Sequence, residues 1–130
     1  MLGSVITDQT VIADLEAGIG TLTRLPDGAI DVAIIVVEPT PRSLDVGVRA
    51  RDLAHERGVK QIVVVANRMA DEADRVRVAE AFGDLEVVVI PDDPAVVRAE
   101  REGLAPMDSS PDSPAVRALV DLADRLVAVS

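Results

Sequence analysis

The chain has 130 residues, of which 48% are hydrophobic, and it carries a formal net charge of -10 and a single aromatic side chain, Phe82. This length predicts one domain over residues 1–130 with an aliphatic core. The acidic charge repels phosphate backbones and anionic lipids, so we expect no nucleic-acid or membrane partner. The sequence has no cysteine, which excludes disulfides and thiolate metal sites. Because it has neither a signal-like N-terminus nor an apolar run of membrane-spanning length, we expect a soluble, cytoplasmic protein.

The first half of the chain alternates apolar runs with a helix signal. Runs rich in β-branched residues predict strands over Val11–Ala13, Val32–Val37 and Ile62–Ala66, and their continuous apolar character is typical of strands buried on both faces. Ser43–Arg57 follows a proline and ends at Gly58, which predicts a helix between the second and third runs.

The second half repeats this alternation. It predicts, in order, a helix over Asp71–Phe82, a strand over Val87–Ile90, a short helix over Pro94–Glu102 and a polar loop over Met107–Ser113. An N-cap serine followed by proline, Ser113-Pro114, opens a last amphipathic helix. It carries apolar residues at helical spacing, namely Val116, Leu119, Val120, Ala123, Leu126 and Val127. Strands alternating with helices predict a three-layer α/β domain, with a mostly parallel sheet and helices on both faces.

Polar residues follow each of the four predicted strands. They are the segments Asp14-Leu15-Glu16-Ala17-Gly18, Glu38-Pro39-Thr40, Asn67-Arg68 and Pro91-Asp92-Asp93-Pro94. Taken singly, each segment is explained by the turn formers that any strand needs to leave a core. Because ligands of such folds bind beyond the carboxyl ends of the strands, the four segments are also the candidate site.

Taken together, these segments match a known family. The series IADLEAGI, VAIIVVEPTPRSL, GVKQIVVVANRM and VIPDDPAV resembles the C-terminal half of MinD/ParA-type P-loop ATPases. It is most similar to the branch that matures carbon monoxide dehydrogenase, the CooC-like proteins. The resemblance covers nearly all of the chain and implies a partial P-loop NTPase fold that handles ATP or ADP with Mg²⁺.

The resemblance also implies roles for individual residues. Asp14 matches the acidic residue at the end of the Walker B strand, a catalytic residue that holds Mg²⁺ through water. Glu16 and Gly18 match the switch segment beside the γ-phosphate, in which Glu16 is the second catalytic residue. The implied nucleotide-binding positions are Glu38, Asn67, Arg68, Pro91, Asp92 and Asp93. Among these, Asn67 matches the amide that reads the adenine edge, and the Pro91–Asp93 loop matches the lining of the base.

One family feature is missing from these residues. The glycine-rich loop that cradles phosphate groups with backbone N–H groups and a lysine belongs before the Walker B strand. Residues 1–10 contain one glycine and no lysine, and the sole lysine, Lys60, begins a predicted strand at the opposite end of the sheet. The cysteine pair that holds metal between CooC-like subunits is also absent. The sequence therefore predicts a truncated or split ATPase, inactive alone, with a metalloenzyme as a possible client.

The missing loop has a consequence for the sheet. In the family, the strand that feeds this loop lies between the strands matched here by Val11–Ala13 and Val32–Val37. Its absence leaves unpaired strand edges, and Val32–Val37 carries no charge, proline or glycine to protect one. We therefore expect association with another chain, as a homodimer or, less favoured, with a separate P-loop half. Closure of the two strands on each other is the third outcome.

Other interpretations remain open at this point. Gly18-Ile19-Gly20 after a strand, with Glu38 further on, suggests a dinucleotide-binding domain, but Thr23 replaces the third glycine and Pro26 shortens the crossover helix. A phosphoacceptor receiver domain would need a lysine after its last strand, where Lys60 does not lie. A non-catalytic interaction module derived from such an ATPase is the remaining alternative.

Overall fold

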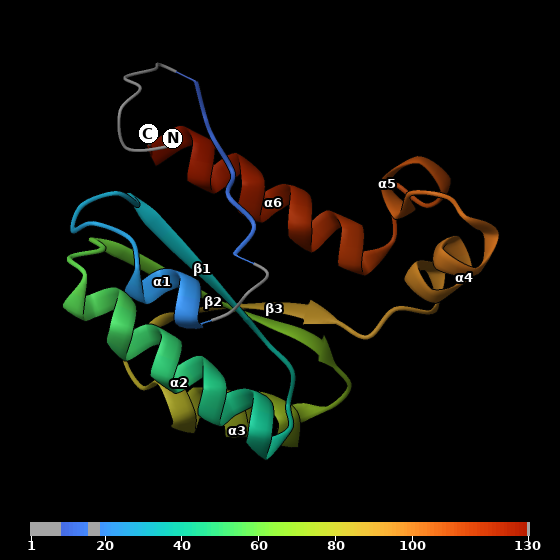
Figure 1. Cartoon of the computed structure of the whole chain (residues 1–130). Helices are drawn as coiled ribbons and strands as arrows, with labels where there is room; N and C mark the ends of the chain where they lie inside the picture. The colour runs from blue at the N-terminus through green and yellow to red at the C-terminus, as the bar shows by residue number, and fades with distance from the viewer. Residues whose placement is uncertain (1–8, 16–18, 130) are drawn as a thin grey trace.

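A computed structural model describes residues 9–15 and 19–129 (Figure 1). Three parallel strands form one sheet in the order β1-β2-β3. The strands are β1 (Val32–Val37), β2 (Gln61–Met69) and β3 (Glu86–Pro91). The helices are α1 (Ile19–Thr23), α2 (Pro41–Glu56), α3 (Glu72–Phe82), α4 (Pro94–Glu102), α5 (Pro106–Ser109) and α6 (Pro114–Val129). The predicted α/β class and the parallel sheet are confirmed.

Helices cover both faces of this sheet. α2 and α3 lie on one face and α6 lies on the other, so the predicted three layers are present (Figure 1). The core under α2 and α3 contains Ile35, Val37, Val64, Ala66, Met69, Val78 and Phe82. The core under α6 contains Val63, Val65, Ile90, Ala115 and Leu122. Residues Val63–Ala66 of β2 alternate between these cores, which explains why the middle of this strand is continuously apolar.

The structure corrects two sequence predictions. The first predicted strand, Val11–Ala13, is wrong: these residues are coil outside the sheet, and the Val11 and Ile12 side chains are 59% and 89% exposed. A run of three apolar residues offers too few ladder hydrogen bonds to form a strand unless a neighbouring strand supplies packing. The predicted loop over Met107–Ser113 is also partly wrong, because it includes most of α5, whose first turn begins at Pro106.

The carboxyl end of β2 contains a bulge that the sequence did not predict. Ala66 and Met69 both reach the core under α2 and α3 although they are three positions apart, so the regular alternation slips by one residue between them. The backbone irregularity includes Arg68, which adopts a left-handed conformation with a φ of 59°. It is the one non-glycine residue with positive φ in the described part of the chain, and this conformation disfavours a residue with a Cβ.

α2 approaches the sheet unusually closely at Gly47. A Cβ atom at this position would lie 2.5 Å from Cγ1 of Val37 and 2.9 Å from Cζ of Phe82. Both neighbours are buried core side chains, so neither can swing away into solvent. The absence of a side chain at residue 47 therefore sets the distance between α2 and β1.

Two apolar side chains of β1 are exposed on the side of the sheet that α6 covers. β1 pairs with β2 alone in the part of the chain that the structure describes, and its Ile34 and Val36 side chains, on the α6 side, are 47% and 61% exposed. Leu119 and Val127 are exposed too, on the flank of α6 opposite Arg125, which pairs with Glu86 of β3. We call these four exposed apolar side chains of β1 and α6, Ile34, Val36, Leu119 and Val127, the open face.

Candidate functional site at the strand ends

Three strand ends converge at the carboxyl edge of the sheet. Arg68, at the end of β2, lies with its Nη1 3.6 Å from Oε1 of Glu38 and its Nε 4.0 Å from Oδ1 of Asp92. Glu38 directly follows β1 and Asp92 directly follows β3. All three side chains are about half exposed or more, so the ion pairs are solvent-screened and individually weak. The arginine nevertheless stands between two carboxylates, so its charge is already compensated.

The loop after β3 is fixed against the same end of β2. Pro91 pairs in register with Met69, and the backbone N–H of Asp92 donates to the Met69 carbonyl over 3.1 Å. Asn67 is half-buried next to this loop and, by alternation from Val65, belongs to the α6 side of the sheet. The structure therefore brings Glu38, Asn67, Arg68 and the Pro91–Asp93 loop to the same edge of the sheet, and their roles in nucleotide binding stay predictions.

The N-terminus of α2 is built from the segment that follows β1. The Thr40 hydroxyl accepts a hydrogen bond from the Ser43 N–H over 3.2 Å, which makes Thr40 the N-cap. The Ser43 hydroxyl in turn accepts from the backbone N–H of Glu38 over 2.9 Å. Ser43 was predicted as the first residue of the helix, which begins two residues earlier at Pro41, directly after the Thr40 cap. These bonds hold Glu38 where its side chain can reach Arg68.

Asp93 is buried, with 8% of its surface exposed, and both of its carboxylate oxygens are engaged. Oδ1 accepts from the Ala95 N–H at the start of α4, and Oδ2 accepts from the Ala115 N–H at the start of α6, each over 3.0 Å. These backbone N–H groups, that of Ala115 first, hold the pKa of Asp93 below its ordinary value. Asp93 thus caps two helices. The prediction that the Ser113 side chain caps α6 is wrong, because its buried hydroxyl lies beside this carboxylate and accepts no hydrogen bond from the helix.

Replacing Asp93 by asparagine should destabilise the protein at neutral pH and much less in acid. Because the pKa is lowered in the folded state, the carboxylate stabilises the fold above its ordinary pKa of about 3.8, and this contribution is lost as the pH falls through the lowered value. Thermal unfolding of both proteins between pH 7 and pH 3 measures the effect. The difference in Tm should shrink with falling pH, and a constant difference would contradict the assignment. Asp108→Asn, on the exposed α5, serves as the control.

The residues expected to contact phosphate and Mg²⁺ are not part of this cluster. Asp14 is exposed in the coil segment 9–15, outside the sheet, and Glu16 and Gly18 lie outside the described residues. Within residues 9–15 and 19–129, no three His, Asp or Glu side chains are grouped to hold a metal ion. The described residues therefore gather the strand-end positions at one edge of the sheet, but they group no carboxylates that could hold a Mg²⁺–phosphate unit.

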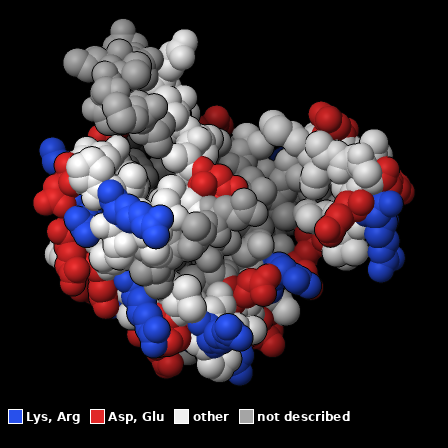
Figure 2. Space-filling model, in the orientation of Figure 1, with Lys and Arg blue, Asp and Glu red and all other residues white. Residues whose placement is uncertain are grey.

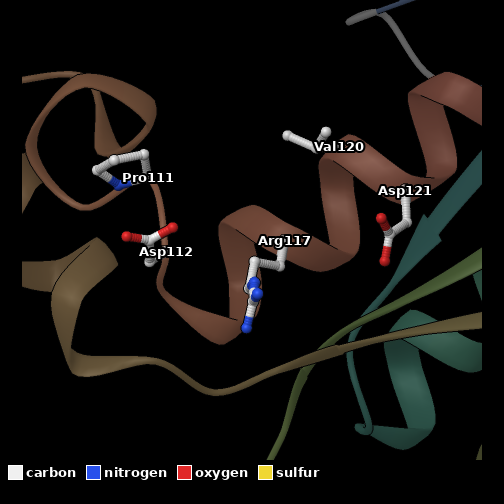
Figure 3. A pocket seen from close by; sticks show the side chains of 5 residues that line it. All are labelled: Pro111, Asp112, Arg117, Val120 and Asp121. Carbon is white, nitrogen blue, oxygen red and sulfur yellow. The ribbon is translucent and has the colours of Figure 1, made fainter.

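The described residues also form shallow grooves away from the strand ends. Acidic and basic side chains are interspersed over the face shown in Figure 2. A shallow groove on the outer side of α6 is lined by Pro111, Asp112, Arg117, Val120 and Asp121 (Figure 3). None of the predicted site residues lines it. No helix in the described part of the chain has the length and apolar character needed to cross a bilayer.

The architecture places the chain in a class: a partial P-loop NTPase fold of the MinD type, with its candidate site at the carboxyl edge of a parallel sheet. MinD of Pyrococcus horikoshii OT3, in complex with Mg-ADP, superposes with a TM-score of 0.63 at 22% identity, over 75% of this chain and 42% of that one. This likeness shows a shared fold. No family model matches the sequence.

Sequence relatives narrow the class. The carbon monoxide dehydrogenase accessory protein CooC of Rhodospirillum rubrum is 34% identical over 104 residues, which is 79% of this chain and 40% of the relative. An uncharacterised ATP-binding protein of Methanocaldococcus jannaschii is 35% identical over 97 residues, 72% of this chain and 37% of the relative. The chain belongs, as a partial and CooC-like member, to the MinD/ParA-type P-loop ATPases. It spans about 40% of the length of these curated relatives.

Proposed function

We propose that this chain supplies the base-binding half of a CooC-like ATPase, which hydrolyses ATP only when a phosphate-binding loop is provided by other residues. The single observation that carries the proposal is the convergence of Asn67 with the Pro91–Asp93 loop at the carboxyl edge of the sheet. An amide beside a fixed loop can pair with the hydrogen-bonding edge of adenine. ATP and Mg²⁺ enter the proposal through the relatives, one of which is described as ATP-binding.

The roles of the remaining predicted residues follow from this proposal. Asp14 and Glu16 would act in hydrolysis, and Gly18 would approach the γ-phosphate, once the phosphate loop is in place. The client would be a metalloenzyme, because the CooC relative is named as an accessory protein of carbon monoxide dehydrogenase. Without cysteine, this chain cannot hold nickel through thiolates, so it would act on the client by nucleotide-dependent association. We place it in the cytoplasm, as one domain over residues 1–130.

The open face is where we propose that the phosphate-loop half docks. A strand could add at the edge of β1 that pairs with no strand in the described part of the chain, and a helix over Ile34 and Val36 would bury their apolar side chains. Charge favours such a partner over the homodimer. In an antiparallel pair of β1 strands, Asp31 of one copy would face Glu38 of the other at both ends, and each chain carries a net charge of -10.

A second candidate function is a non-catalytic interaction module, which the same open face supports. Such a module would use the surface of β1 and α6 for a partner and would need no nucleotide at the strand ends. Nucleotide binding therefore discriminates the two functions.

Titration with adenosine and with ATP tests the proposed base site. Adenosine should bind weakly and within about fivefold of ATP, because the triphosphate finds no matching donors and meets an acidic surface. Isothermal titration calorimetry measures both affinities. Asn67→Ala should weaken adenosine binding by about tenfold, since one hydrogen bond to the base is lost.

Gln61→Ala is the matched control for this titration, because it removes an amide from the opposite end of the same strand. Equal adenosine affinities for the Asn67 and Gln61 variants would argue against the proposed pocket. A strong preference of the wild type for ATP would mean that this chain binds phosphate itself. Absence of binding by either ligand would favour the interaction module.

A further inference from the structure

The strained backbone of Arg68 calls for a physical explanation. Its φ of 59° is unfavourable for a residue with a Cβ, and glycine or asparagine would adopt it more readily. The bulge itself needs only a left-handed residue, which lets Met69 return to the core. An arginine at this position therefore contributes something that the bulge does not require.

That contribution is a link between neighbouring strand ends. The guanidinium forms ion pairs with Asp92, on the loop after β3, and with Glu38, after β1. The next residue along the chain, Met69, accepts a hydrogen bond from the Asp92 N–H at its carbonyl. The Pro91–Asp93 loop is thus held to β2 twice, once through the main chain and once through the Arg68 side chain. Asn67 precedes Arg68 directly, so the same link fixes the loop relative to the Asn67 amide.

We infer that Arg68 is a positioning residue, which holds the Pro91–Asp93 loop beside Asn67 and does not itself bind the phosphates of a ligand. This inference rests on the proposed function, because it assigns Arg68 a part in forming the base site. The carboxylates of Glu38 and Asp92 support it, since two negative charges beside the guanidinium oppose the approach of an anionic ligand.

The test combines hydrogen exchange of the free chain with adenosine titration. Arg68→Gly removes the guanidinium while suiting the left-handed backbone, so the fold should keep its Tm or gain slightly. The Asp92 amide should exchange about 2–5-fold faster, as expected for loss of an exposed ion-pair link, and the Val64 amide in the sheet should not change. Adenosine affinity should fall by a similar factor. Arg68→Lys should restore part of both effects.

Asp92→Asn should also make the amide of residue 92 exchange faster. The double variant should exchange no faster than Arg68→Gly alone, because both substitutions remove the same contact. Arg49→Ala, which breaks the exposed pair with Asp45 on α2, is the matched control. Unchanged Asp92 exchange in Arg68→Gly would overturn the inference. Faster exchange in a protein whose wild type binds no adenosine would instead uphold the positioning role and refute the base site. An ATP preference that disappears in Arg68→Gly would show a phosphate contact and overturn it.

Discussion

The isolated chain should show no Mg²⁺-dependent ATP hydrolysis, and turnover should appear when a phosphate-loop partner is added. Loss of a single preorganised donor to a transition state costs about 10²–10³ in kcat, and this sequence lacks a whole set: the backbone loop and its lysine. Phosphate release in the steady state measures the rate. A suitable partner is the part of the R. rubrum relative outside the matched 104 residues.

Substitution of two exposed valines, Val36 and Val76, distinguishes specific docking on the open face from nonspecific effects in this experiment. Val36→Lys places a charge on the open face and should abolish the gain of activity, because a buried unpaired lysine opposes strand addition. Val76→Lys makes the same change on the exposed side of α3 and should leave the gain intact. Turnover by the isolated chain that is lost in Asp14→Ala would contradict the prediction, because it would mean that these residues form a complete site.

Replacing Gly47 by valine should lower the free energy of unfolding by about 1–3 kcal/mol, as overpacking of a close-packed core does. The new side chain would meet Val37 and Phe82, and valine gains only a few tenths of a kcal/mol in helix propensity over glycine, too little to offset the clash. Urea or thermal unfolding measures the loss. Gly20→Val in α1 is the control, since nothing lies within 4 Å of a Cβ there, and similar losses in both variants would contradict the packing argument.

Most of the fold could be predicted because its signals are local. The runs that became β1 and β3 were recognised from their uninterrupted β-branched residues, and α4 was predicted with the bounds it has. Capping residues and glycines beyond the helix ends gave the limits of α2 and α3 to within a few residues. The failure at Val11–Ala13 has a physical origin: strand formation depends on a neighbour, and composition does not reveal whether a neighbour exists.

The candidate site was predicted as a set of positions, but its internal contacts were not. Strand ends identified Glu38, Asn67 and Asp92, because parallel strands share a carboxyl edge. The bulge at Arg68 was missed because β2 was expected to end at Ala66, whereas it continues to Met69. The capping of α6 by Asp93 joins residues 22 positions apart, and such a long-range hydrogen bond leaves no local pattern to recognise.

Asp93 connects the proposed base site to the open face, because its two carboxylate oxygens accept hydrogen bonds from two different helices. Asp93 belongs to the loop beside Asn67, and its Oδ2 holds the first turn of α6, the helix whose flank borders the open face. A ligand that displaces this loop must therefore also displace α6 or break the bond. Binding at these two proposed sites would then be linked, and linkage is reciprocal: the factor by which a base ligand changes the affinity for the partner equals the factor by which the partner changes the affinity for the ligand.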